Sequence, residues 1–217
     1  MNRKRFTLIV SLLALLSVLA LSAYAQDSEP SVSTTTVHRM SDASEIAGSS
    51  SQLTRYPNGV TATLSTSDLE PGTVYTVWWV IFNSPENCTD GQCSLDDIFV
   101  FADDTTTERD DAGNRVLDMD NIAASNISVQ HASGSVSADG SLAVSASLGR
   151  GEVPGVVFGP GLLDPYTAEV HLVVRTHGPA VADAYEAQLS TFGGGCEPMD
   201  AAPCDDVQFV IHMPAGM

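Results

Sequence analysis

Residues 73–82 read TVYTVWWVIF, ten consecutive residues that are all apolar, aromatic or β-branched. A short run without a polar face is typical of a strand that is buried on both sides of a sheet. Side chains alternate along a strand, so Trp78 and Trp79 are predicted to point into two different layers. We therefore place a central strand here and assign both tryptophans to the core rather than to a sugar-binding face.

The segments around this strand alternate apolar and polar residues, which predicts strands with one buried face. The alternation is clear at 60–65, 142–148, 168–176 and 207–213 and weaker at 126–137, and 98–102 is another short apolar run. Turn residues separate these segments, for example DLEPG at 68–72 and the hairpin signal Asp139-Gly140.

The whole pattern predicts an all-β fold, either a β-sandwich or a small antiparallel barrel, with about six to eight strands. One short helix is predicted near 179–190. Pro179 suits a first helical turn, and the apolar residues between Val181 and Leu189 follow a helical period.

The chain begins with a basic head, NRKR at 2–5, followed by an apolar run at 6–21 and the small-x-small motif Ala23-Tyr24-Ala25. This order is typical of a secretory signal peptide that is cleaved after Ala25. An uncleaved membrane anchor is the alternative, but the apolar run is at the short end for a membrane span. We expect a secreted or periplasmic protein without integral membrane contact after cleavage.

The domain organisation predicted from these features has three parts. Residues 1–25 form the signal peptide, residues 26–52 form a polar, partly disordered leader, and residues 53–214 form a single β-sandwich domain.

The chain is strongly acidic, with 27 acidic and nine basic residues and a formal charge of −18. Cleavage after Ala25 removes three basic residues, including the only lysine, and no acidic residue, which leaves a charge of −21. Such a field repels nucleic acid and anionic membranes and makes cations plausible partners.

The four cysteines are predicted to form disulfides, because export favours oxidation and their number is even. Four cysteines allow three pairings, and we favour the two local ones, Cys88–Cys93 and Cys196–Cys204. A four-cysteine zinc site is the alternative, but these spacings are poor for zinc.

Three histidines are candidate ligands for copper or zinc. Glu169, His171, Arg175 and His177 share one face of the strand at 168–176, and His212 points away from the apolar row of the last strand. Imidazoles on adjacent strands can hold such a metal. Each histidine could instead lie on a solvated face or bond a backbone carbonyl. His171 and His177 are about 20 Å apart on an extended strand, so they meet only if the chain bends.

The stretch at 103–121 is a candidate calcium site because carboxylates are calcium ligands, with Asp110 and Asp111 as its central pair. Its spacing does not match an EF-hand, and a solvated acidic loop is the alternative. The further acidic residues of the stretch are Asp103, Asp104, Glu108, Asp118 and Asp120.

Three strings resemble a family of uncharacterised exported bacterial proteins: TVYTVWWVIFNSPENC, EVHLVVRTHGPA and the VQFVIH within CDDVQFVIH. A looser similarity links the chain to the β-sandwich domains of chordin, in which a strand with spaced histidines follows a Gly-rich hairpin. Neither resemblance assigns chemistry to a residue of this sequence.

No catalytic signature is present, since the sequence lacks a G-x-S-x-G elbow and its cysteines are assigned to disulfides. We expect an exported, disulfide-bonded, non-catalytic binding or envelope-surface module with an unknown ligand. The alternatives are a metal-dependent exported enzyme that uses the strand histidines and a calcium-stabilised structural domain.

Overall fold

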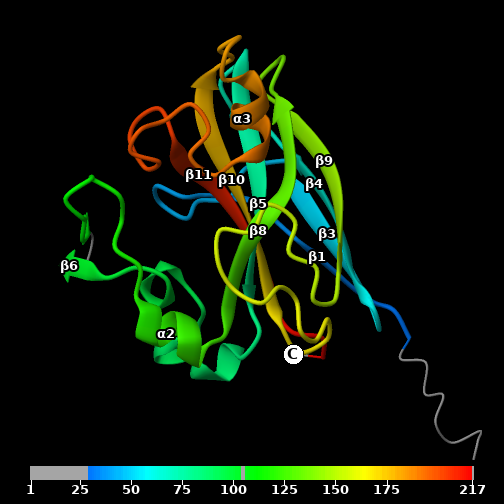
Figure 1. The fold of residues 1–217 in the computed structure, drawn as a ribbon. Helices are drawn as coiled ribbons and strands as arrows, with labels where there is room; N and C mark the ends of the chain where they lie inside the picture. The colour runs from blue at the N-terminus through cyan, green and yellow to red at the C-terminus, as the bar shows by residue number, and fades with distance from the viewer. Residues whose placement is uncertain (1–28, 104–105, 217) are drawn as a thin grey trace, which may run out of the picture.

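The computed structural model describes residues 29–103 and 106–216, so the predicted signal peptide at 1–25 lies outside the described residues. Two antiparallel sheets face each other (Figure 1). The four-stranded sheet has the order β1 (Ser31–Thr35), β3 (Ser50–Tyr56), β4 (Gly59–Thr66) and β9 (Leu142–Gly149). The five-stranded sheet has the order β2 (His38–Arg39), β11 (Asp205–His212), β10 (Glu169–Pro179), β5 (Thr73–Phe82) and β8 (Ile127–Val136). The fold is a β-sandwich, which confirms the all-β prediction.

The main hydrophobic core fills the space between the two sheets. Leu53 and Leu64 enter it from the four-stranded sheet, and Trp79, Leu172 and Val210 enter it from the five-stranded sheet. Each of these side chains is at most 2% exposed. The alternation of apolar and polar residues in the sequence therefore reports the inward face of each strand.

Strand β5 is buried along its whole length between β10 and β8. Trp79 belongs to the core between the sheets, and Trp78 belongs to a second apolar cluster on the opposite face. The structure confirms both the predicted central strand and the opposite directions of the two tryptophans.

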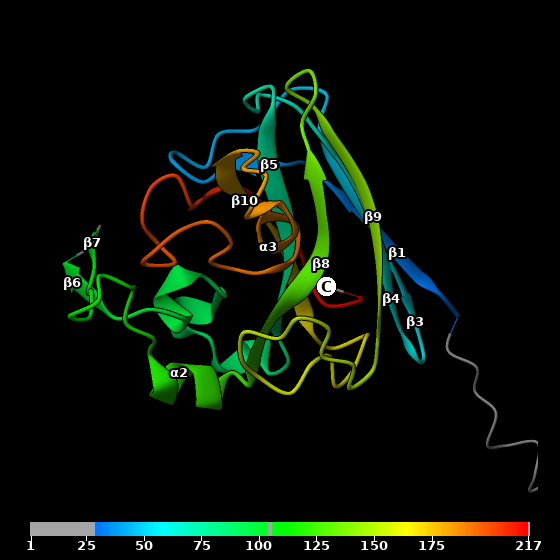
Figure 2. The same cartoon turned by 45° about the horizontal axis from the view of Figure 1, so that its top comes forward.

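The second apolar cluster exists because irregular segments cover the outer face of the five-stranded sheet. Ile98, Phe99 and Ile122 from this cover pack with Trp78 and Phe82 of β5. Figure 2 shows α2 and the small β6–β7 hairpin on the side of β5 that faces away from β4 and β9. The elements between β5 and β8 are η1 (Pro85–Asn87), η2 (Thr89–Gly91), η3 (Leu95–Asp97), β6 (Phe101–Asp103), β7 (Thr106–Thr107) and α2 (Met119–Ala124).

The predicted helix near 179–190 is present but starts later, as α3 (Tyr185–Ser190). Pro179 still pairs with Thr73 of β5, Gln188 bonds the backbone of Val181 and Pro179, and residues 182–184 form a turn before the helix begins. In the described part of the chain, no helix is long and apolar enough to cross a membrane.

The domain begins before residue 53, because the segment predicted as a partly disordered leader contains β1, β2 and the start of β3. Val37 and Ile46 from this segment are buried in the main core. β1 reads SVSTT and lies at the edge of its sheet, where neither face is fully buried. An edge strand of this kind lacks the apolar alternation that reveals a strand in a sequence.

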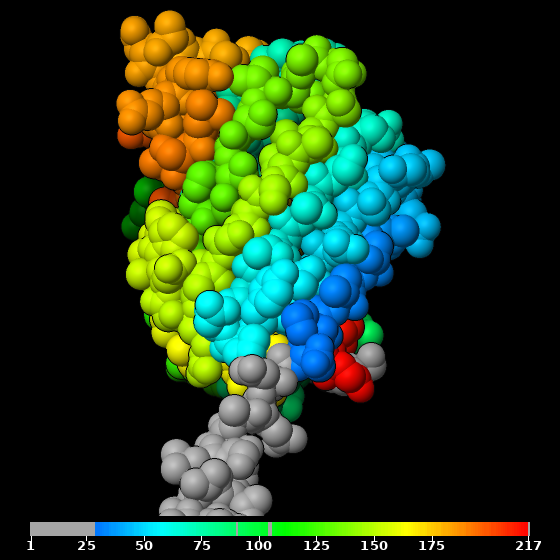
Figure 3. Space-filling model, turned by 90° about the vertical axis from the view of Figure 1, so that its right-hand side faces the viewer, coloured from blue at the N-terminus to red at the C-terminus, as the bar shows by residue number. Residues whose placement is uncertain are grey.

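The outer face of the four-stranded sheet carries mostly small, uncharged side chains. Figure 3 shows this face, with β9, β4, β3 and β1 lying side by side. Thr63 pairs with Ser145 and Gln52 across the strands, and all three are exposed. The polar residues that alternate with apolar ones in these strands therefore form a solvent-exposed face of the sandwich.

Arg55 of β3 connects the four-stranded sheet to the ends of β10 and β11 in the five-stranded sheet. It is 1% exposed, and its guanidinium donates to the carbonyls of Ala168 at 2.9 Å and Met213 at 2.7 Å. It also donates to the carbonyls of Pro165 and His212. Burial lowers the pKa of Arg55 to about 10, which still leaves it charged at neutral pH.

The first prediction concerns this residue. Replacement Arg55→Met removes the donors of four carbonyls, and a buried group that loses its partner costs about 1–3 kcal/mol. We expect the free energy of unfolding to fall by at least about 3 kcal/mol in denaturant titration. The control Arg150→Met changes an exposed residue and is expected to stay within about 0.5 kcal/mol of the parent. Equal losses in the two variants would contradict the structural role of Arg55.

Candidate functional site

A cavity of about 980 Å³ lies between the outer face of the five-stranded sheet and the segments that cover it. Val80 of β5, Val173 of β10 and Ile211 of β11 line it from the sheet. Phe99 and Phe158 line it from the covering segments. The cavity is therefore mostly apolar and has walls that come from distant parts of the sequence.

The cavity coincides with short side chains on the sheet. The outward row of β5 reads Trp78, Val80 and Phe82, so a small residue stands between two large ones. Val173 lies directly across from Trp78 on β10. The valines leave room above the sheet, and the larger aromatic side chains border it.

One polar pair faces this apolar space. Glu169 and His171 of β10 both line the cavity and are 3% and 7% exposed. The Nε2 of His171 donates to Oε1 of Glu169 at 2.6 Å, and the imidazole lies against Phe82 with ring centroids 4.9 Å apart. Among the described residues, Nδ1 of His171 has no hydrogen-bond partner.

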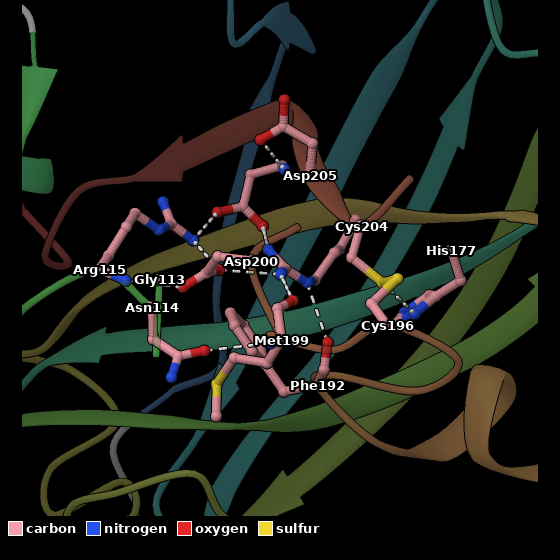
Figure 4. A network of polar contacts seen from close by, with 12 residues as sticks. Gly113, Asn114, Arg115, His177, Phe192, Cys196, Met199, Asp200, Cys204 and Asp205 are labelled. Carbon is pink, nitrogen blue, oxygen red and sulfur yellow. Dashed lines mark hydrogen bonds and ion pairs between the residues drawn. A yellow bond between two sulfur atoms is a disulfide. The ribbon is translucent and has the colours of Figure 1, made fainter. Parts of the chain in front are cut away.

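A network of ion pairs, shown in Figure 4, contributes Arg115, Asp200 and Asp206 to the lining of the cavity. Arg175 is fully buried and donates to Asp206 at 2.8 Å and Asp200 at 2.9 Å. Arg115 donates to the same two carboxylates, at 2.9 Å to Asp206 and 3.0 Å to Asp200. The guanidinium of Arg175 also lies over the ring of Phe192, 4.0 Å from its centroid.

The opposite charges in this network outweigh the cost of burial. Burial alone would raise the pKa of Asp200, but Arg115 and Arg175 hold it below its ordinary value. Burial opposes the charge on Arg115, but Asp206 and Asp200 raise its pKa above the ordinary value. The ion pairs therefore hold the two arginines and the two carboxylates in place.

The disulfides secure both parts of the cover. Cys88 is bonded to Cys93 and Cys196 to Cys204, which is the predicted local pairing. Cys93 lines the cavity, and the second bridge closes the loop that carries Met199 and Asp200. Two of the segments that line the cavity are therefore cross-linked loops, whereas Phe99 and Phe158 lie outside both bridges.

The structure does not bring His171, His177 and His212 together. His212 lies directly opposite Val170, so it faces the core between the sheets, whereas His171 faces the cavity. β10 remains extended through Pro179, which places His171 and His177 at opposite ends of the strand. The sequence showed which residues share a face of one strand. It did not show which of these faces lie on the same side of the sheet in neighbouring strands.

His177 and His212 each have their own partners. His177 bonds Oγ1 of Thr76 at 2.8 Å and the carbonyl of Gly194 at 2.9 Å. His212 bonds the hydroxyls of Ser33 at 2.9 Å and Ser51 at 3.0 Å. Both nitrogens of each ring are occupied, as expected for histidines that stabilise a fold.

The central pair proposed for calcium, Asp110 and Asp111, lies in an exposed turn, and Asp104 of the same proposal lies outside the described residues. Oδ1 of Asp110 accepts from the backbone of Ala112 and Asn114, both at 2.9 Å, and Asp111 is exposed beside it. Within residues 29–103 and 106–216, no group of three or more His, Cys, Asp or Glu side chains is placed to hold a metal ion. The copper, zinc and calcium assignments stay predictions.

Sequence reasoning missed the role of Arg115, Asp200 and Asp206. Arg115 lies 85 residues from Asp200 and 91 from Asp206, so no local spacing connects them. The scarcity of basic residues was the one available signal, because a buried charge needs partners and carboxylates are plentiful in this chain.

Comparison with protein-family models, with curated proteins and with solved structures finds no match for this chain. The resemblances to an exported bacterial family and to chordin domains therefore stay predictions.

The second prediction follows from the burial of His212. Burial, together with the charges of Arg55 and His171, lowers the pKa of His212 to about 4. Since the folded state favours the neutral ring, this stability is complete above about pH 6.5 and is lost as the pH falls towards 4. The loss amounts to about 3 kcal/mol.

Replacement His212→Gln removes the titrating group and keeps a side chain that can bond Ser33 and Ser51. We expect the stability of the variant relative to the parent to improve by about 3 kcal/mol between pH 7 and pH 4 in denaturant titrations. Parallel curves for the parent and the variant would contradict this assignment.

Proposed function

We propose that this chain is an exported, disulfide-bonded binding module that holds a small apolar molecule in the cavity on the outer face of its five-stranded sheet. The observation that carries the proposal is the cavity itself, about 980 Å³ in volume and lined mainly by apolar and aromatic side chains. Ligand sites of small molecules have this size and composition, with a few convergent polar groups.

The construction of the cavity supports binding of a ligand in a prepared site. Two disulfides and the four-membered ion network fix the covering loops in place. A site that is ordered before binding loses less conformational entropy when the ligand enters, which favours affinity.

The groups around the cavity favour binding over catalysis. Asp200 and Asp206 are occupied by two arginines. Among the described residues that line the cavity, only Ser94 has a hydroxyl, and it accepts from the backbone of Asp96 as a helix cap. The described lining residues therefore offer no hydroxyl or free thiol that is hydrogen-bonded to His171, as a Ser–His or Cys–His pair requires.

Export is part of the proposal for two reasons. The first 25 residues have the order of a secretory signal peptide, and all four cysteines are paired. Disulfides of this kind persist in the oxidising environments outside the cytoplasm.

The third prediction tests the cavity with one substitution at two places. Val173→Trp fills the floor of the cavity, and Val32→Trp adds the same side chain on the exposed outer strand β1. We expect an environment-sensitive apolar fluorophore to bind the parent and Val32→Trp alike, and Val173→Trp at least about ten-fold more weakly.

Circular dichroism and thermal melts of both variants establish that each is folded. Unchanged affinity in folded Val173→Trp would show that the fluorophore binds elsewhere and would contradict the proposed site. A calorimetric titration of the parent should also give a negative heat-capacity change, the expected signature of apolar burial.

A further inference from the structure

The polar pair in the cavity defines which end group a ligand can carry. Glu169 and His171 are at most 7% exposed, and both lie on the cavity wall among apolar side chains. A buried polar group in such surroundings is costly unless it is bonded. The bond between Nε2 and Oε1 satisfies one atom of each residue and leaves Nδ1 of His171 without a partner among the described residues.

The carboxylate of Glu169 fixes the orientation of the imidazole. Oε1 of Glu169 accepts a hydrogen bond from the N–H group at Nε2, with 2.6 Å between the nitrogen and the oxygen. In the neutral ring, Nδ1 is then a hydrogen-bond acceptor. The contact with Phe82 further restricts the ring. Nδ1 thus offers an acceptor in a fixed position to a group inside the cavity.

The charges around the cavity disfavour a ligand with an anionic end group. Arg115 is the sole Lys or Arg among the described residues that line it, and this arginine bridges Asp200 and Asp206 together with Arg175. Within the part of the chain that the structure describes, the carboxylate of Glu169 and the lining residues Asp96 and Asp110 have no arginine partner. An anionic end group would therefore meet a field of its own sign.

We propose that the ligand is an apolar molecule whose polar end donates a hydrogen bond, a hydroxyl or an amine, to Nδ1 of His171 beside Glu169. This inference rests on the proposed function, because it assumes an apolar molecule in the same cavity. It excludes a fatty-acid carboxylate as the preferred ligand.

The test compares four compounds that share a ten-carbon chain: 1-decanol, decylamine, 1-methoxydecane and decanoate. Each displaces the bound fluorophore from the full mature protein at about pH 7.5. We expect the alcohol and the amine to bind at least about ten-fold more tightly than the methyl ether, which has an oxygen but no donor, and than the carboxylate.

Two variants identify the polar pair as the cause. In Glu169→Gln/His171→Phe the preference for donors should disappear, while the ether binds as in the parent. In Ile211→Ala, which reduces the apolar wall and keeps the pair, all four compounds should weaken and their order should stay the same. If the double variant does not fold, the order of the four compounds in the parent still decides the matter.

Three results would overturn the assignment. Decanoate binding as tightly as decanol would show that the site accepts anions, and an ether equal to the alcohol would show that no donor is recognised. Preference for decylamine alone would show attraction by charge. Each of these leaves the apolar binding site intact, whereas failure of all four compounds to bind would overturn the proposed function and this inference together.

Discussion

The burial of β5 on both faces is the constraint on which the rest of the molecule depends. A sandwich of two sheets covers only the inward side of each strand, yet β5 is apolar on both. The chain satisfies this requirement with a second apolar cluster outside the sandwich, formed between Trp78 and Phe82 of β5 and residues of the covering loops such as Phe99. Without that cover, two large aromatic side chains would lie on an open sheet surface.

Loops that cover a sheet need cross-links to hold them in place, because they form few regular backbone hydrogen bonds of their own. Each part is cross-linked locally, by Cys88–Cys93 and by Cys196–Cys204. Arg175, on the sheet, then bonds the carbonyls of Phe192 and Met199 and so attaches the second loop to β10. The segments that cover the second apolar cluster also line the cavity. The cavity is therefore a consequence of how the second face of β5 is covered.

The sequence predicted the parts of the fold that local patterns determine. The run at 73–82 matches β5 residue for residue, and the two disulfides join cysteines that are close in the chain. It did not predict β1 or β2, whose short polar strands gain their order from neighbours. It also could not give the register between strands. β10 and β11 are neighbours, as the metal hypothesis required, but the pairing of Val170 with His212 turns that histidine inward.

Three histidines that looked equivalent in the sequence differ because of their surroundings. His177 and His212 have partners for both ring nitrogens, so the hydrogen bonds of these two rings stabilise the fold. His171 has one bonded nitrogen and faces the cavity. A buried ring with a free acceptor is poorly suited to stabilising a core and well suited to orienting a ligand. The inferred preference for a hydrogen-bond donor therefore depends on Nδ1 of His171, which has no partner among the described residues, and only the tertiary pairing of β10 with β5 and β11 could reveal this.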